Sequence, residues 1–500
     1  MAVELLDVVI VGAGLSGIGQ AVHLQRECPD KSYAILEGRD AIGGTWDLFR
    51  YPGIRSDSDM YTLGYGFKPW THNKAIAQGE TIREYIRETA GEYGIEQHVR
   101  FNTRVTAANW SSNEALWHIT AQRTDTGETV HYAANMLLVC AGYYSYKQGH
   151  RPDFPGEEAF KGTVVHPQHW PEDLDYSGKR AVIIGSGATA ITLVPSMADT
   201  AGHVTMLQRS PTYVISRPSS SWLSTAMRRV LPDSWVYNLT RWCHRSMQHV
   251  FYNRTRSHPE QIKTYLLNTV KKKLGPDFDV EKHFTPSYNP WDQRLCLIPD
   301  DDLFDALKSG DASVVTDTIE TFTETGIQLT SGAHLDADII VTATGLELVI
   351  FGELEITVDG AQVDYSQRWT YKGIAMSGVP NFITTFGYLN ASWTLRADLI
   401  SQWVCRLINH MDETGQRQAM PTVRPEDENM TPAPHFGDFT AGYLQRVMHL
   451  LPKQGDHAPW TNPQDYVLER KVFLKGPIDD GHMVFSHPAG AERPLLVAAE

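Results

Sequence analysis

Residues 5–17 read Leu5-Leu6-Asp7-Val8-Val9-Ile10-Val11-Gly12-Ala13-Gly14-Leu15-Ser16-Gly17, and this stretch decides the fold. Its apolar, β-branched first half predicts a strand buried on both faces, and the glycines predict a tight turn into a helix. Gly12 allows the turn, Gly14 lets a pyrophosphate approach the backbone, and Gly17 lets the helix pack on the strand. A second strand, over 32–36, ends at Glu37, whose carboxylate suits the ribose hydroxyls of FAD or NAD.

A second strand–turn–helix–strand unit begins at residue 180. Its strand over 180–184 leads into the turn Gly185-Ser186-Gly187-Ala188-Thr189-Ala190, in which alanine replaces the third glycine. The next strand, over 203–207, is followed by Arg209, in the position that corresponds to Glu37. A guanidinium can hold a 2′-phosphate with two hydrogen bonds, so this unit favours NADPH over NADH. A lone arginine is more often a solvated surface residue, but its place at the strand end favours the nucleotide.

Two such units in a chain of 500 residues predict an α/β fold with two Rossmann-like dinucleotide-binding domains, for FAD and for NADPH. Residues 217–290 break the alternation and predict a helical insertion. The expected segments are 1–145 (FAD-binding domain, first part), 146–216 (NADPH-binding domain, first part), 217–290 (insertion), 291–374 (NADPH-binding domain, second part) and 375–500 (FAD-binding domain, second part, and C-terminal tail). Residues 394–411 have helical periodicity, and the last dozen residues are expected to fray.

Composition narrows the function classes. The net charge of −15 disfavours nucleic-acid binding. Five scattered cysteines without a Cys-x-x-Cys pair indicate a reducing cytoplasm and argue against a disulfide reductase. We expect no secretion signal, no transmembrane segment and no metal site. The insertion is rich in Arg, Lys and aromatic residues such as Trp235 and Trp242, which suits a solvated helix and also a helix on a membrane surface, so peripheral association stays open.

Two further stretches are more specific. One runs from Gly43-Gly44-Thr45-Trp46 through Tyr51-Pro52-Gly53 to Asp57, and the other is Phe160-x-Gly162-x-x-x-His166-x-x-x-Trp170-Pro171. Both resemble the fingerprints of type I Baeyer–Villiger monooxygenases, with every fixed position filled. The wider segment 46–61 is similar to one subgroup of that family, the ethionamide-activating enzymes. This resemblance implies an FAD- and NADPH-dependent monooxygenase.

The resemblance also implies a set of cofactor-binding residues. Those expected along FAD, besides the glycines of the first turn, are Ser16, Glu37, Thr45, Trp46, Asp47, Leu48, Asp57 and Val105. Those expected along NADPH are Arg55, Ser56, Asp57, Gly185, Ser186, Gly187, Ala188, Thr189, Ala190, Ile191, Arg209 and Ser210. His166 is expected either to position the domain junction or to be an ordinary structural histidine.

Arg294 matches the active-site arginine of the family, because it follows the segment Tyr288-Asn289-Pro290-Trp291-Asp292-Gln293. Gln293 departs from the lysine that is common there. Asp57 is expected to hold Arg294 in position. A fixed guanidinium would stabilise an anionic C4a-peroxyflavin and the adduct formed when it attacks a ketone. The expected reaction inserts one atom of O₂ into a ketone to give an ester or lactone, and it extends to sulfoxidation.

Two alternatives stay open. A flavin monooxygenase that acts mainly on sulfur or nitrogen, as in thioethers or thioamides, would use the same cofactors. A non-catalytic sensor would bind FAD and NADPH without oxygen-dependent turnover. In the expected substrate loop, Tyr388 and Trp393 either line a pocket for linear, aryl or sulfur-bearing substrates or belong to the core.

Overall fold

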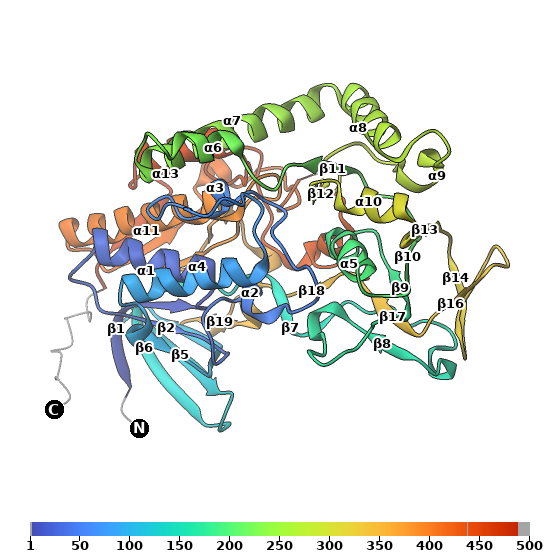
Figure 1. The fold of residues 1–500 in the computed structure, drawn as a ribbon. Helices are drawn as coiled ribbons and strands as arrows, with labels where there is room; N and C mark the ends of the chain where they lie inside the picture. Colours follow the sequence, from blue (N-terminus) through green and yellow to red (C-terminus); the bar gives the residue numbers. More distant parts are fainter. Residues whose placement is uncertain (1–2, 438, 489–500) are drawn as a thin grey trace.

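The computed structural model describes residues 3–437 and 439–488, which form two sheet-based units with a layer of helices along one edge (Figure 1). The tail expected over 489–500 lies outside the described residues. The predicted fold class, two Rossmann-like units with a helical insertion, is confirmed. Within the described part of the chain, no helix combines the length and apolar character needed to cross a bilayer.

The first unit is built on a nine-stranded sheet. Its central strands β6 (Thr129–Val139), β1 (Glu4–Val11), β2 (Tyr33–Leu36) and β3 (Val99–Arg100) are parallel neighbours in that order. β5 (Leu116–Arg123) and β4 (Thr103–Ser111) continue the sheet with antiparallel pairing beyond β6, and β23 (Phe382–Thr384) pairs with β6 in parallel. Residues 8–11 of β1 are buried, as expected for a central strand covered on both faces.

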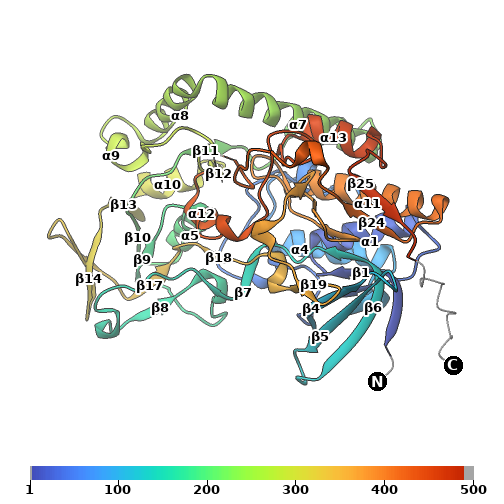
Figure 2. The same ribbon diagram turned by 180° about the vertical axis from the view of Figure 1, so that it is seen from behind.

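Helices α1 (Leu15–Glu27), α4 (Gly79–Glu92) and α11 (Trp393–Thr414) cover one face of this sheet (Figures 1 and 2). α11 confirms the helix predicted over 394–411. It shares a hydrophobic core with α1 and β1, because Leu399 and Trp403 pack in the same buried cluster as Ile10 and Val22. The first Gly-rich turn is thereby held between a buried strand and a buried helix.

The second unit has a five-stranded parallel sheet in the order β13 (Ala312–Thr316), β10 (His203–Gln208), β9 (Arg180–Ile184), β17 (Ile339–Thr342) and β8 (Thr163–Val165). Helices α5 (Ala188–Ala198) and α10 (Asp302–Ser309) share the buried core of this unit with its strands. An antiparallel sheet of β14 (Ile319–Thr323), β15 (Gly326–Leu329) and β16 (His334–Asp336) projects at its edge.

The insertion forms α6 (Trp222–Met227), α7 (Asp233–Ser257), α8 (Pro259–Leu274) and α9 (Val280–Phe284). α7 packs on the first unit at α3 (Met60–Leu63), although it interrupts the second unit in sequence. Arg241 donates to the carbonyl oxygens of Tyr61 and Gly64, each at 2.7 Å. The insertion therefore spans both units (Figure 1).

Two strand pairs lie where the chain crosses between the units. β7 (Tyr144–Gly149) pairs with β18 (Leu346–Leu348), and β11 (Val214–Arg217) pairs with β12 (Cys296–Pro299). β19 (Glu355–Val358) then pairs with β4, and β20 (Ala361–Gln362) extends that edge. The expected segment 291–374 therefore ends too late: the chain rejoins the first sheet by Glu355, because β18 and one short turn carry it directly back.

Candidate active site

The first Gly-rich turn needs its glycines for steric reasons. Gly12 has a φ of +101°, and its N–H donates to the carbonyl oxygen of Leu36 at 2.9 Å. A Cβ on Gly17 would lie 1.9 Å from the carbonyl oxygen of Gly12, so only glycine lets α1 start this close to the turn. α1 follows Gly14 with no side-chain cap and no acidic residue in its first turn. Its first N–H groups therefore suit a phosphate.

Glu37 directly follows β2 and is 4% exposed. Its Oε2 accepts a hydrogen bond from the N–H of Ala13 at 2.6 Å, and its Oε1 accepts one from the N–H of Arg39 at 2.9 Å. Burial raises the pKa of the Glu37 carboxyl, although both hydrogen bonds act to lower it. Each oxygen keeps a second acceptor position, so Glu37 can also accept ribose hydroxyls from the cavity that it lines.

The second turn follows the same backbone path with different chemistry. Gly185 has a φ of +139°, and Gly187 precedes α5, again without a side-chain cap. The Ser186 hydroxyl donates to the carbonyl oxygen of Ser210 at 2.8 Å, which ties the turn to the end of β10. Arg209 is exposed on the same cavity, and it forms no ion pair with any other residue in the described ranges. Its guanidinium is therefore available for a phosphate.

A cavity of about 1390 Å³ runs between the two turns and brings most of the predicted residues together. Those on its wall are Gly12, Gly14, Ser16, Glu37, Thr45, Trp46, Arg55, Ser56, Asp57, Val105, Gly185, Ser186, Gly187, Ala188, Thr189, Arg209, Ser210 and Arg294. The predicted residues that do not line it are Gly17, Asp47, Leu48, Ala190 and Ile191. These five are buried and do not lie on the cavity wall.

Asp47 shows what one of these buried residues does. Its carboxylate pairs with Arg39 at 2.7 Å and with Arg50 at 2.9 Å. Burial acts to raise the pKa of Asp47, but the two guanidinium groups outweigh it, and the pKa is lowered. Asp47 therefore stays ionised and fixes Arg39, which lines the cavity next to Glu37.

Arg294 extends into the cavity beside Asp57, to which its Nη1 donates at 2.9 Å. The Arg294 side chain is 31% exposed, and its buried Nε has no hydrogen-bond partner among the described residues. Burial acts to lower the pKa of Arg294, but nearby Tyr443, Tyr143 and Asp57 raise it well above its ordinary value. The guanidinium thus carries a permanent charge, with donors still directed at the cavity.

The loop before Arg294 is held by α7. Asp292 pairs with Arg256 of α7 at 2.7 Å, and Trp291 packs edge-to-face on Tyr252 of α7 at 5.8 Å. Trp291 has a φ of +70°, a strained backbone for a bulky residue. Such strain persists only where neighbours enforce the conformation, so the insertion helps to set the position of Arg294.

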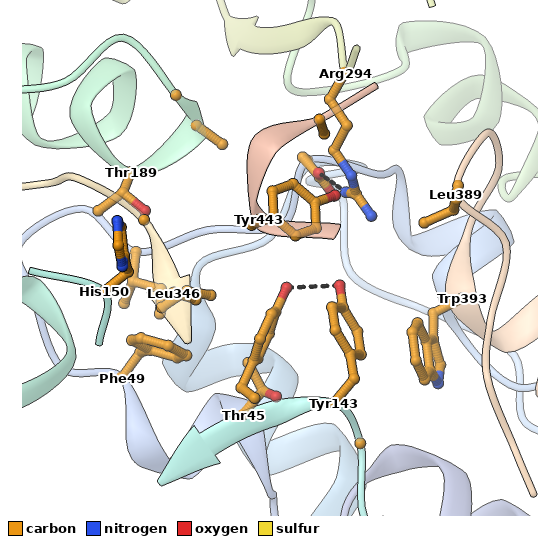
Figure 3. Close-up of a pocket in the computed structure, with 18 of the residues that line it drawn as sticks. Thr45, Phe49, Tyr143, His150, Thr189, Arg294, Leu346, Leu389, Trp393 and Tyr443 are labelled. Carbon is orange, nitrogen blue, oxygen red and sulfur yellow. Dashed lines mark hydrogen bonds and ion pairs between the residues drawn. The ribbon is translucent and has the colours of Figure 1, made fainter. Parts of the chain in front are cut away.

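Two aromatic side chains that were not expected at the site, Tyr143 and Tyr443, lie on opposite walls of the cavity. Figure 3 shows Arg294 and Tyr443 across the cavity from Tyr143 and Trp393. Tyr143 stacks on Trp393 with ring centroids 5.2 Å apart, and its hydroxyl lies 2.6 Å from that of Tyr144. Tyr143 and Tyr144 directly follow the strand and small-residue turn over 136–142, a local signal that could have drawn attention to them. Tyr443 has no such signal.

Of the two aromatics expected in the substrate loop, Trp393 faces the cavity (Figure 3). Its indole N–H donates to the hydroxyl of Ser16 at 2.7 Å, so it links α11 to the first turn. Tyr388 also borders the cavity but is only 2% exposed, and its ring lies 5.7 Å from the guanidinium of Arg396. Tyr388 is therefore largely a core residue.

Both fingerprints lie where the two units meet. A Cβ on Gly53 would lie 1.7 Å from the hydroxyl oxygen of Ser196 in α5, so the Tyr51-Pro52-Gly53 loop packs directly on the second unit. Arg55 of the same loop pairs with Asp302 of α10. His166 Nε2 lies 3.2 Å from the carbonyl oxygen of Gly345, and burial lowers the pKa of this histidine. Since His166 is absent from the cavity wall, a positioning role at the junction suits it better than a chemical one.

Comparisons with known proteins identify the family of this chain. The sequence model described as flavin-binding monooxygenase-like matches residues 65–431, and that of an NAD(P)-binding Rossmann-like domain matches residues 10–75. The FAD-containing monooxygenase EthA of Mycobacterium tuberculosis (strain ATCC 25618 / H37Rv) is 51% identical over 495 residues, 99% of both chains. The probable FAD-binding monooxygenase AlmA of Acinetobacter baylyi (strain ATCC 33305 / BD413 / ADP1) is 49% identical over 489 residues, 96% of both chains.

Solved structures give the same fold. An oxidised steroid monooxygenase bound to NADP superimposes with a TM-score of 0.75 at 22% identity, and it covers 97% of this chain and 100% of its own. The open crystal structure of cyclohexanone monooxygenase gives a TM-score of 0.75 at 20% identity, with the same coverage. The monooxygenase predicted from the fingerprints is thereby confirmed at the level of the family: the chain belongs to the flavin-binding monooxygenase-like family.

Proposed function

We propose that this protein binds FAD at the first turn and NADPH at the second, and inserts one atom of O₂ into ketones to give esters or lactones. When bound, the two cofactors supply the hydride and the ring on which O₂ is activated. The relatives named as FAD-containing and the structural neighbour titled as bound to NADP support this pairing. The residues of this chain bind the cofactors, orient the ketone and stabilise charge.

The donor and acceptor groups of the cavity fit these cofactors. Glu37 offers carboxylate oxygens to a ribose, and Arg209 offers a guanidinium to a 2′-phosphate. Six residues on the cavity wall carry a buried polar side-chain atom without a hydrogen-bond partner among the described residues: Arg39, Arg55, Gln248, Trp291, Arg294 and Tyr388. Buried polar atoms in native proteins are rarely unpaired, so this concentration indicates a polar ligand.

The single observation that carries the proposal is the Arg294–Asp57 pair in a cavity bordered by both turns. Negative charge develops on the carbonyl oxygen of a ketone when a nucleophile adds to it. A guanidinium that is already fixed and charged stabilises this oxygen without rearranging, and more strongly than it would in bulk water. Asp57 positions the group, because it occupies Nη1 and leaves other donors directed at the cavity.

Oxygenation of sulfur or nitrogen is the second candidate, and the opposite wall favours it. Burial raises the pKa of Tyr143 to about 12 and that of Tyr144 well above its ordinary value, so both phenols stay protonated. Proton donors at this wall would favour transfer of an electrophilic oxygen to a thioether or thioamide. This route does not need the charge of Arg294.

Replacement of Arg294 by alanine tests the proposal. We expect NADPH still to reduce the flavin in stopped-flow spectra, while ester formation from a linear methyl ketone falls by at least about 10²–10³-fold. Arg294→Lys keeps a positive charge but loses the planar, bidentate donor geometry of the guanidinium, and its ester yield should be intermediate. Undiminished ester yield from Arg294→Ala would refute the assignment. If a thioether is still oxygenated while the ester is lost, the arginine serves the ketone route alone.

A further inference from the structure

Exposed apolar side chains concentrate at one edge of the molecule. Among the described residues, twelve large hydrophobic side chains are exposed, and nine of them lie in α7, in the turn before it or at the start of α13 (Tyr466–Lys475). Met247 lies on the flank of α7, which leaves eight. We define these eight as the apolar face: Val230, Leu231, Trp235, Leu239, Trp242, Val250, Val467 and Leu468. Figures 1 and 2 both show α7 and α13 together along this edge.

The apolar face is one side of a firmly held helix. Trp235, Leu239, Trp242 and Val250 recur at the spacing that places side chains on one side of a helix. The opposite side is anchored: Tyr237 is buried and donates to the carbonyl oxygen of Tyr65 at 2.9 Å. Arg245 stacks on Tyr466 at 5.0 Å and so joins α13 to α7. The outward tryptophans, 69% and 57% exposed, are thus held in the solvent by well-packed structure.

The insertion that carries most of this face is basic, whereas the protein as a whole is acidic. Residues 217–290 contain twelve Lys and Arg but five Asp and Glu, whereas the whole chain contains 44 and 59. Arg229 and Arg254 are exposed beside the apolar face, and α13 adds Arg470, Lys471 and Lys475, all exposed. An acidic protein therefore carries a basic insertion, and exposed Arg and Lys side chains flank the apolar face.

We propose that the apolar face docks on the surface of an anionic phospholipid bilayer. Tryptophan side chains favour the interface between lipid headgroups and acyl chains, and surrounding Lys and Arg are attracted to anionic headgroups. A bilayer fits better than a second copy of this chain, because a symmetric contact would bring each copy's Arg229 and Arg254 against like charges. α7 would lie on the membrane surface, with its outward tryptophans in the interfacial layer.

This surface is independent of the oxygenation chemistry but adjoins the same cavity. His244, Gln248 and Phe251, on the inner side of α7, line the cavity. A docked α7 would place the wall of the cavity next to the lipid, where apolar substrates concentrate. The vesicle experiment measures binding alone, so its outcome does not depend on which substrate is oxidised.

The test is co-sedimentation of the full-length, flavin-loaded protein with vesicles of phosphatidylcholine alone or mixed with phosphatidylglycerol. We expect the wild type to sediment with the mixed vesicles and to be released by high salt. Trp235→Ser/Trp242→Ser should lower the bound fraction at least about tenfold. Leu450→Ser, which removes an exposed apolar side chain outside the face, should bind as the wild type does. Because all three side chains are exposed, flavin retention and NADPH oxidation should be unchanged.

Three results would overturn the proposal. The wild type could stay in the supernatant with the mixed vesicles, or the double variant could sediment as well as the wild type. Equal binding to neutral vesicles would remove the role of the basic residues. A wild type that ignores vesicles but forms a dimer abolished by the double variant would assign the face to a second copy. Brominated lipids give a check without mutation, since docking should quench tryptophan fluorescence of the wild type.

Discussion

The two Gly-rich turns share a backbone and differ in the side chain that completes each of them. Gly12 and Gly185 both have positive φ, and α1 and α5 both begin three residues later without a side-chain cap. In the first unit, the strand that follows α1 leads to a buried carboxylate, Glu37, whose two oxygens accept hydrogen bonds from backbone N–H groups. In the second unit, the strand that follows α5 leads to an exposed guanidinium, that of Arg209. Under the proposed function, the backbone of each turn would cradle phosphates and the strand-end residue would select the nucleotide.

The difference in burial also bears on how long each nucleotide stays. A ligand held by Glu37 must sit inside the first unit, whereas a ligand held by Arg209 reaches the edge of the cavity. We therefore expect FAD to remain bound through many turnovers and NADPH to exchange. If the contrast between the two nucleotide sites depends on the residues that differ between the turns, substitutions at those residues should affect the two sites differently.

The largest effect is expected from the third position of the turn, which is Gly17 in one unit and Ala190 in the other. Gly17→Ala places a Cβ 1.9 Å from the carbonyl oxygen of Gly12, and neither backbone can yield without opening the turn. We expect a loss of at least about 3 kcal/mol in unfolding free energy and a protein purified without flavin colour. Denaturant unfolding and the flavin absorbance measure both.

Ala190→Gly is the matched control in the second unit. It removes a buried methyl group and loosens the first turn of α5, and it should cost about 1 kcal/mol while flavin content stays normal. If Gly17→Ala retains full flavin, or if Ala190→Gly is equally damaging, the steric contrast between the two turns is wrong.

The conformation of these turns can be predicted from the sequence for a local reason. Positive φ at Gly12 and close packing at Gly17 depend on residues within one short segment, so the pattern of glycines predicts them. The pairing of Arg294 with Asp57 joins residues far apart in the chain, and no spacing rule predicts it. Family resemblance proposed this pair, and the structure brings its members within 2.9 Å.

Other features lay beyond the sequence because they depend on tertiary packing. Tyr443 lines the cavity, but the sequence around it contains no recognisable motif. β19 is too short for the sequence to predict that it pairs with β4 in the first sheet. α7 reads as an insertion in the second unit, yet Arg241 binds it to carbonyl oxygens of the first. Asp47 and Ile191 were expected to contact cofactors but do not lie on the cavity wall, since a motif does not reveal which of its side chains point inward.

A smaller effect is expected from Arg209→Ala. Loss of charge-assisted hydrogen bonds to the 2′-phosphate should raise KM for NADPH about 10- to 100-fold, equivalent to about 1.4–2.8 kcal/mol, and leave KM for NADH nearly unchanged. Steady-state oxidation of the two nucleotides measures the ratio. The KM of Arg209→Lys for NADPH should lie between those of the wild type and Arg209→Ala, because lysine keeps the charge but loses the bidentate donor geometry. Unchanged preference in Arg209→Ala would mean that the second unit selects its nucleotide elsewhere.

The smallest effect concerns Glu37 and its dependence on pH. Burial raises the pKa of Glu37, so the folded apoprotein takes up a proton more readily than the unfolded chain. Its contribution to apoprotein stability is therefore complete below the unfolded pKa and is lost as pH rises through the folded pKa. Flavin binding should show the opposite trend, because ribose hydroxyls need the ionised carboxylate as acceptor. As pH falls through the acidic range, flavin affinity should weaken by a few-fold to about tenfold, and Glu37→Gln should flatten both trends. Fluorescence titration of the apoprotein with FAD at several pH values measures this trend, with Arg209→Ala, a change at an exposed residue of the other unit, as the control. An unaltered pH profile in Glu37→Gln would show that the buried carboxylate does not bind the nucleotide.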